Sequence, residues 1–132
     1  MGVAMGAMSI EDLVARVTAG VPVDFDQVIA AIDTHYHYQP CRFRNGVGRD
    51  ALVNERGTNE GSCKIFFFAR LLGFDEAQTL ALFGDYYRQD VLKNPGGTNH
   101  ANIRRFARDG WPGIIHEGVA LVPRAPDNEG RA

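Results

Sequence analysis

The sequence predicts a mainly α-helical single domain, with about five helices around a buried central helix and a minor antiparallel β hairpin or small sheet. Two observations lead to this fold class. The 132 residues are 45% hydrophobic, which suits one core, and the chain is too short to need two. Apolar residues recur at helical spacing in five segments, each bounded by capping residues, glycine or proline. We therefore treat residues 1–132 as one domain and expect flexible tails at 1–8 and 126–132.

The first two helices are predicted from capping boxes, in which a polar side chain at the helix start and a partner three residues later bind free backbone amides. Ser9 starts the first helix, and Gly20 ends it. Asp24 starts the second helix, which we expect to end near His37, before a proline.

The third helix, from Glu60 to Leu72, is apolar on nearly every face. Only a helix surrounded by other elements tolerates that pattern, so we expect it to be the central helix. A fourth helix should begin at Asp75 and run until Pro95, which would make it the longest. The fifth is expected from about His100 to Asp109.

The chain between Pro40 and Gly57 loses the helical period and contains Asn-Gly and glycine turn signals. This pattern predicts a small hairpin. The later string "GVALVPR", from Gly118, predicts a last short strand. We expect the hairpin and this strand to form the minor antiparallel sheet.

Charge and hydropathy exclude several function classes. The formal net charge is −2, with acids and bases mixed, so no basic field for nucleic acid is expected. Uninterrupted apolar runs are far shorter than the roughly 20 residues that span a bilayer, so we expect no membrane segment. We expect no cofactor, and we interpret Cys41 and Cys63 as reduced thiols because neither has a CxxC partner.

The string Gly-Thr-Asn occurs twice, at Gly57 and at Gly97, each time just before an apolar segment. An internal repeat is excluded because the similarity stops after one helical turn. A phosphate-binding P-loop is excluded because Lys64 is followed by Ile65 and the glycine spacing is wrong. We predict that both stretches are helix entries, capped by the oxygen of a Thr or Asn side chain.

Two such helix starts would share a ligand site if they converged, because free amides and positive dipole ends would face one spot. Asn59, His100 and Asn102 could line that site, with Arg88 reaching in from the fourth helix. The expected ligand is a small anion or carboxylate.

An enzyme is the competing hypothesis. Cys63 follows a helix start, where the dipole lowers a thiol pKa, and His100 with Asn99 or Asn102 could complete a Cys-His-Asn set. This set would suit a small cysteine-dependent hydrolase or acyltransferase. Our main interpretation is that Cys63 is a small core residue, so no catalytic residue is favoured.

Two other clusters have structural interpretations. His35 and His37 form an HxH pair, but residues two apart on a helix point about 200° apart, so we expect no metal site. Arg104, Arg105 and Arg108 form a basic helical patch, which we interpret as a solvated face.

Six strings between about Phe25 and Leu121 carry a family resemblance: "YHYQP", "FRNG", "NEGSCKIFFFA", "QTLALFGDYYRQDVL", "GTNHANIRRF" and "GWPG". In this order they resemble the HopJ type III effector family of bacterial proteins, which is named for proteins that plant-pathogen secretion systems deliver. The resemblance implies no reaction and no cofactor. We favour a noncatalytic protein that binds a small anionic ligand or a protein partner. We expect it in the bacterial cytoplasm, or delivered to a host cell if it is a true effector.

Overall fold

The structure, a computed structural model, describes residues 7–125. The tails expected at 1–8 and 126–132 lie outside these residues, except for Ala7 and Met8, which pack against the core. The helices are α1 (Ile10–Thr18), α2 (Phe25–His35), α3 (Glu60–Leu72), α4 (Glu76–Ala81), the π-helix η1 (Tyr86–Val91), α5 (Ala101–Asp109) and the 3₁₀-helix η2 (Trp111–Gly113). The strands are β2 (Tyr36–Tyr38), β3 (Phe43–Asn45), β4 (Leu52–Asn54), β5 (Ile115–His116) and β6 (Leu121–Pro123).

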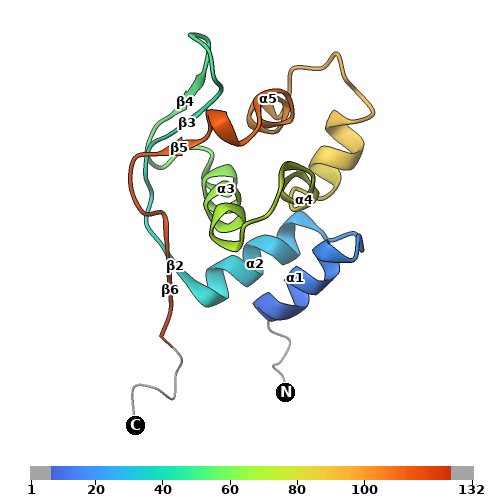
Figure 1. Cartoon of the computed structure of the whole chain (residues 1–132), viewed down its shortest axis with the longest axis vertical. Coiled ribbons are helices and arrows are strands. Elements are labelled where there is room, and N and C mark those ends of the chain that lie inside the picture. The colour runs from blue at the N-terminus through green and yellow to red at the C-terminus, as the bar shows by residue number, and fades with distance from the viewer. Residues whose placement is uncertain (1–6, 126–132) are drawn as a thin grey trace.

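The strands form two small antiparallel sheets along one side of the helices (Figure 1). The predicted hairpin is confirmed as β3 and β4, with Phe43 opposite Asn54. The expected pairing of the last strand is wrong, because β6 pairs with β2 and the hairpin is joined by β5 instead. The second helix ends at His35, two residues before the predicted end near His37, because the next three residues form β2.

The expected long fourth helix is also wrong. Helix α4 has 6 residues, whereas α3 has 13 and is the longest helix of the described chain. The interruption lies at Gly84, whose φ of +61° is the left-handed conformation that glycine favours. A Cβ there would lie 2.7 Å from the backbone nitrogen of Phe25, so the close approach of α2 also requires glycine.

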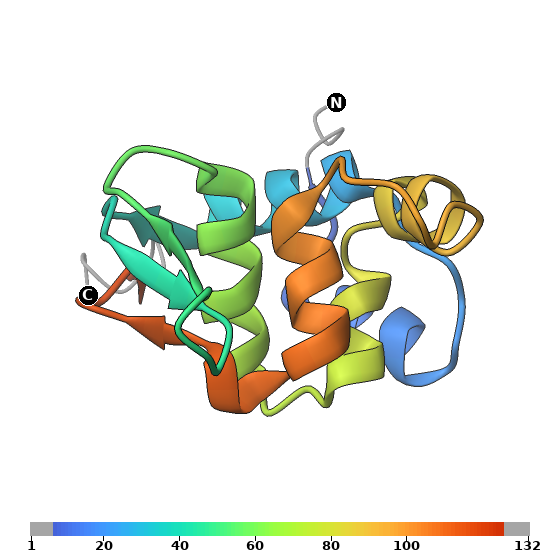
Figure 2. The same cartoon turned by 90° about the horizontal axis from the view of Figure 1, so that it is seen from above.

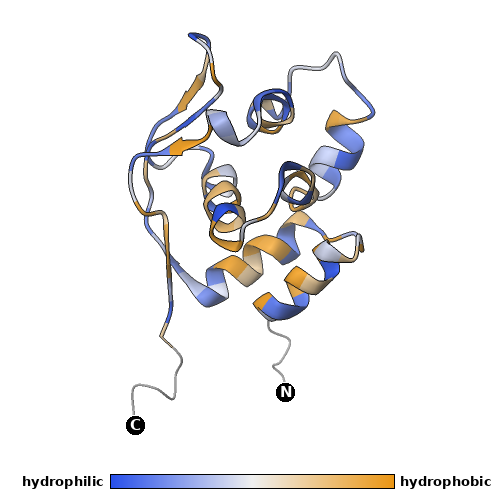
Figure 3. Ribbon diagram, viewed as in Figure 1, coloured by the Kyte–Doolittle hydropathy of each residue, from blue (hydrophilic) through white to orange (hydrophobic). Residues whose placement is uncertain are grey.

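Helix α3 contributes many of the least exposed side chains: Cys63, Ile65, Phe66, Phe68 and Ala69 are each at most 1% exposed. Its Phe66 ring meets that of Phe106 on α5 at a centroid distance of 4.9 Å. Figure 2 shows α3 and α5 beside each other, with the strands on the outer side of α3. Figure 3 shows many hydrophobic residues on α2 and α3. One apolar residue of α3, Leu71 near its C-terminal end, is 51% exposed.

Candidate functional site

Both Gly-Thr-Asn stretches are helix entries, as predicted, but the position of the N-cap relative to the string differs by one residue. Helix α3 follows Asn59, the last residue of the first motif, whereas α5 follows His100, one residue beyond the second motif. The predicted capping is wrong at both helix starts, because neither side chain at the N-cap binds a first-turn amide. The Thr58 hydroxyl instead donates to the carbonyl of Glu55 at 2.7 Å.

Backbone geometry explains the missing caps. Asn59 and His100 have φ of 49° and 54° and are the only non-glycine residues of the described chain with positive φ. Capping residues normally have an extended backbone, which aims the side-chain oxygen at the first turn. In α3 the first intrahelical bond is the one from the Cys63 amide to the Asn59 carbonyl, at 3.0 Å. The earlier amides of the first turn therefore lack an intrahelical partner.

The two uncapped starts open into one cavity of about 380 Å³. We call it the α3–α5 pocket. It is lined by Phe25, Asn59, Gly61, Ser62, Phe83, Tyr86, His100, Ala101, Asn102 and Ile103. The structure therefore brings three of the four predicted ligand-binding residues together. The placement expected for Arg88 is wrong, because its guanidinium donates to the Val23 carbonyl at 3.1 Å and pairs with Asp85, and it does not line the cavity.

Four asparagines hold the two helix starts in place. Asn102 of α5 donates to the Oδ1 of Asn54 at 2.8 Å, and Asn59 donates to the same atom at 2.7 Å. The Oδ1 of Asn102 accepts from both Asn54 and Asn45, each at 3.1 Å. Asn45, Asn54 and Asn102 are buried. This hydrogen-bonded network ties α3 and α5 to the β3–β4 hairpin.

Aromatic rings form the apolar side of the pocket. The ring of Tyr86 lies 4.9 Å from the imidazole of His100 and 5.0 Å from the ring of Phe25, centroid to centroid. His100 Nε2 is 2.9 Å from Asp90, and because a carboxylate only accepts, Nε2 carries the proton. Tyr86 belongs to the π-helix η1, an element often found at functional sites.

The geometry gives no support to the cysteine-enzyme alternative. Cys63 is 1% exposed, and burial, followed by the influence of Cys41, raises the pKa of its thiol to about 12. Its sulfur contacts Cys41, and among the described hydrogen bonds none joins it to a histidine. His100 instead lines the α3–α5 pocket, and Asn102 belongs to the asparagine network.

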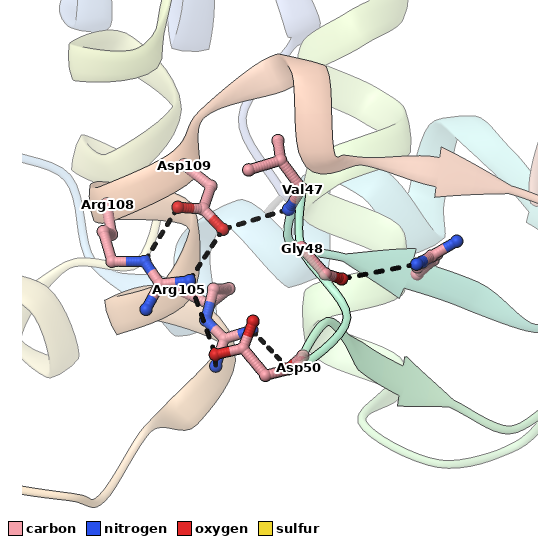
Figure 4. A network of polar contacts seen from close by, with 7 residues as sticks. Val47, Gly48, Asp50, Arg105, Arg108 and Asp109 are labelled. Carbon is pink, nitrogen blue, oxygen red and sulfur yellow. Dashed lines mark hydrogen bonds and ion pairs between the residues drawn. The ribbon is translucent and has the colours of Figure 1, made fainter.

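The basic patch on α5 is a solvated face only in part, because the Arg108 side chain is 56% exposed whereas that of Arg105 is 15% exposed. Arg104 donates to the carbonyls of Asn94, Asp90 and Asn99. Figure 4 shows how the tip of the hairpin is bonded to α5: Arg105 donates to the Asp50 carbonyl at 2.7 Å, and the Val47 amide donates to Asp109 at 3.1 Å. Arg108 binds the same Asp109 carboxylate from within α5. Arg104 and Arg105 therefore have structural roles, whereas Arg108 remains largely in solvent.

The two histidines of the HxH pair lie on different elements, His35 on α2 and His37 on β2. His37 lies 3.1 Å from the guanidinium of Arg124, and His35 ends α2. Across residues 7–125 no three His, Cys, Asp or Glu side chains gather as metal ligands. None of the helices described is long and apolar enough to cross a membrane.

The aromatic side of the α3–α5 pocket is formed by Phe25, Phe83 and Tyr86, and the sequence does not predict it. Phe25 and Phe83 fit the apolar pattern of a core, so nothing in their spacing marked them as pocket residues. The available signal was Gly84, the last residue of the turn that separates α4 from η1, the element that carries Tyr86.

Comparisons with known proteins agree with this fold. The family model described as HopJ type III effector protein matches residues 10–121. Among solved structures, the crystal structure of the unknown-function protein VPA0580 is similar, with a TM-score of 0.84 and 37% sequence identity. The match covers 94% of this chain and 100% of that one. A search of curated proteins gives no significant match.

Proposed function

This chain belongs to the HopJ type III effector family, and we propose that it is a noncatalytic binding protein whose α3–α5 pocket takes a small organic carboxylate. The observation that carries the proposal is the convergence of two uncapped helix starts on one cavity. Delivery to a host cell, which the family description suggests, belongs to the same proposal.

Backbone amides supply the expected anion recognition. Gly61 and Ser62 lie in the first turn of α3, and Ala101 and Asn102 in the first turn of α5; all four line the pocket. Amides of a first helical turn point toward the N-terminus and carry its partial positive charge. A carboxylate with two acceptor oxygens suits two such sets of donors.

The rest of the pocket favours an organic ligand over a bare inorganic ion. The rings of Phe25 and Tyr86 supply apolar contact, and the volume of about 380 Å³ lies in the range of small-molecule sites. None of the ten lining residues is Lys, Arg, Asp or Glu. Recognition would therefore rest on neutral donors, which suits a monoanion better than a phosphate ester of higher charge.

The test compares benzoate with benzamide, a neutral molecule of nearly the same shape. Backbone NMR of the full chain should show that benzoate shifts the amide signals of Gly61, Ser62 and Asn102, while benzamide at equal concentration does not. His100→Ala should weaken benzoate binding several-fold, because the imidazole is part of the wall. His37→Ala removes a histidine outside the pocket and is the matched control.

Two results would contradict the proposed function. Equal binding of benzoate and benzamide would show that the backbone amides do not recognise the negative charge of the ligand. Shifts confined to residues outside the ten lining positions would place the ligand elsewhere.

A further inference from the structure

The only two cysteines of the chain lie side by side, although 22 positions separate them. We infer that Cys41 and Cys63 are a redox modification site, at which a peroxide converts the two thiols into a reversible intramolecular disulfide. This inference is independent of the α3–α5 pocket.

The geometry places the two sulfurs within reach of a bond. Cys41 Sγ lies 4.0 Å from Cys63 Sγ, and the Cys63 thiol also faces the carbonyl of Cys41 at 3.8 Å. A disulfide requires about 2.05 Å between the sulfurs, so the gap must close by about 2 Å. Cys41 lies in the irregular segment between β2 and β3, which is freer to adjust than the helix that carries Cys63.

The two thiols differ in exposure, and this difference determines which one reacts with the oxidant first. Cys41 is partly exposed and can meet an oxidant from solvent, whereas Cys63 is 1% exposed. Burial raises the pKa of Cys63 to about 12, so it is not the thiolate that a peroxide meets first. Cys41 is therefore the thiol that reacts with the oxidant, and Cys63 is the resolving thiol.

Both steps balance with hydrogen peroxide as the oxidant. The Cys41 thiolate attacks one peroxide oxygen, the O–O bond breaks, and hydroxide leaves, which gives a sulfenic acid. The Cys63 sulfur then attacks the Cys41 sulfur, the S–S bond forms as the S–O bond breaks, and the thiol proton leaves with the oxygen as water. In total, two thiols lose two electrons and two protons, and one peroxide becomes two waters.

The cross-link would join the segment before β3 to the first turns of α3. Because a disulfide restricts the unfolded chain, the oxidised protein should unfold at a temperature several degrees higher than the reduced protein. That shift is a readout of the bond itself and needs no ligand.

The experiment treats the full chain with hydrogen peroxide and follows the intact mass. The mass should fall by two hydrogen atoms, digestion should give one peptide pair linked through Cys41 and Cys63, and dithiothreitol should restore the starting mass. Cys63→Ala should instead accumulate a sulfenic acid at Cys41 that dimedone traps, without the rise in unfolding temperature. Cys41→Ser should leave Cys63 unmodified under the same treatment.

Several results would overturn the inference. Two free thiols after treatment, titrated in denaturant, would exclude the bond. A sulfinic acid at Cys41 beside a free Cys63, or a dimer on a non-reducing gel, would show that Cys63 does not resolve the oxidised thiol. If Cys63→Ala does not fold, the Cys41→Ser variant and the wild-type peptide map still decide between these outcomes.

Discussion

Helix starts in this protein are of two kinds. At α1 and α4 the N-cap residues Ser9 and Asp75 have an extended backbone, and their side chains accept from amides three residues later, at 3.0 and 2.8 Å. At α3 and α5 the N-cap residues Asn59 and His100 are left-handed and cap nothing. The first kind satisfies its own amides, and the second leaves them facing a cavity.

The left-handed, uncapped starts of α3 and α5 lower the local stability of the chain. A left-handed backbone costs a non-glycine residue about 1–2 kcal/mol, and a missing cap costs about 1 kcal/mol more. Such costs persist where surrounding structure holds the conformation, and they gather at functional sites. Here the surrounding structure is the asparagine network, which fixes both uncapped starts from the side.

The largest expected effect concerns His116, whose Nε2 lies 3.2 Å from the Cys63 carbonyl in the early turns of α3. Burial lowers the pKa of His116 from 6.5 to about 4. As the pH falls below 6.5 the unfolded chain takes up this proton first, so stability is lost between about pH 6.5 and pH 4. The loss should be about 2–3 kcal/mol, at 1.36 kcal/mol per pKa unit with some allowance for solvent.

Urea unfolding at a series of pH values measures this loss. His116→Phe should remove most of the slope, because no proton then binds at that position, whereas His37→Ala should keep it. An unchanged slope in His116→Phe would show that protonation of this imidazole does not cause the loss of stability.

Next in size is the asparagine network. Asn102→Ala removes the acceptor of the Asn45 and Asn54 amide groups, and it should cost about 2 kcal/mol because buried polar groups lose a partner. The exposed Asn94 is the matched control, and Asn94→Ala should stay within about 0.5 kcal/mol. Chemical denaturation compares the two. Equal costs would mean that the network does not hold the uncapped starts.

The sequence predicts the capped starts well and the uncapped ones only in part. Ser9 and Asp75 follow rules that involve a few neighbouring residues, and those rules hold. The entries at both Gly-Thr-Asn strings are also predictable, but their conformation is not, because partners far along the chain impose it. Asn59 is bonded to Asn54, and His100 to Asp90.

The same distinction separates what could and could not be predicted of the fold. The hairpin and five of the helix entries follow from local turn and capping signals. The pairing of β6 with β2 and the addition of β5 to the hairpin depend on long-range register, which no local pattern states. In the pocket, Asn59, His100 and Asn102 were predictable from the helix starts, while the rings of Phe25 and Tyr86 were not.

Substitution by threonine at a capped helix start and at an uncapped one tests whether the two kinds of start differ in backbone conformation. Threonine is a good N-cap in extended backbone but is disfavoured in the left-handed region. Ser9→Thr should therefore change the free energy of unfolding by less than about 0.5 kcal/mol. Asn59→Thr should cost about 1–2 kcal/mol, because the backbone at Asn59 must stay left-handed. Thermal unfolding of both variants tests this, and equal effects would mean that the two starts do not differ in kind.

The smallest expected change in unfolding free energy distinguishes the capping residue Ser9 from Thr98, which belongs to a Gly-Thr-Asn string but caps no helix in the structure. Ser9→Ala should destabilise by about 1 kcal/mol, because the Asp12 amide loses the acceptor it has at 3.0 Å. Thr98 belongs to the second Gly-Thr-Asn motif, but it is exposed and lies two residues before the N-cap of α5. Thr98→Ala should therefore cost less than about 0.5 kcal/mol. Denaturant titrations of the two variants in one buffer resolve the difference. If Thr98→Ala costs as much as Ser9→Ala, the hydroxyl of Thr98 caps α5 in solution, and the amides assigned to a carboxylate ligand already have a partner.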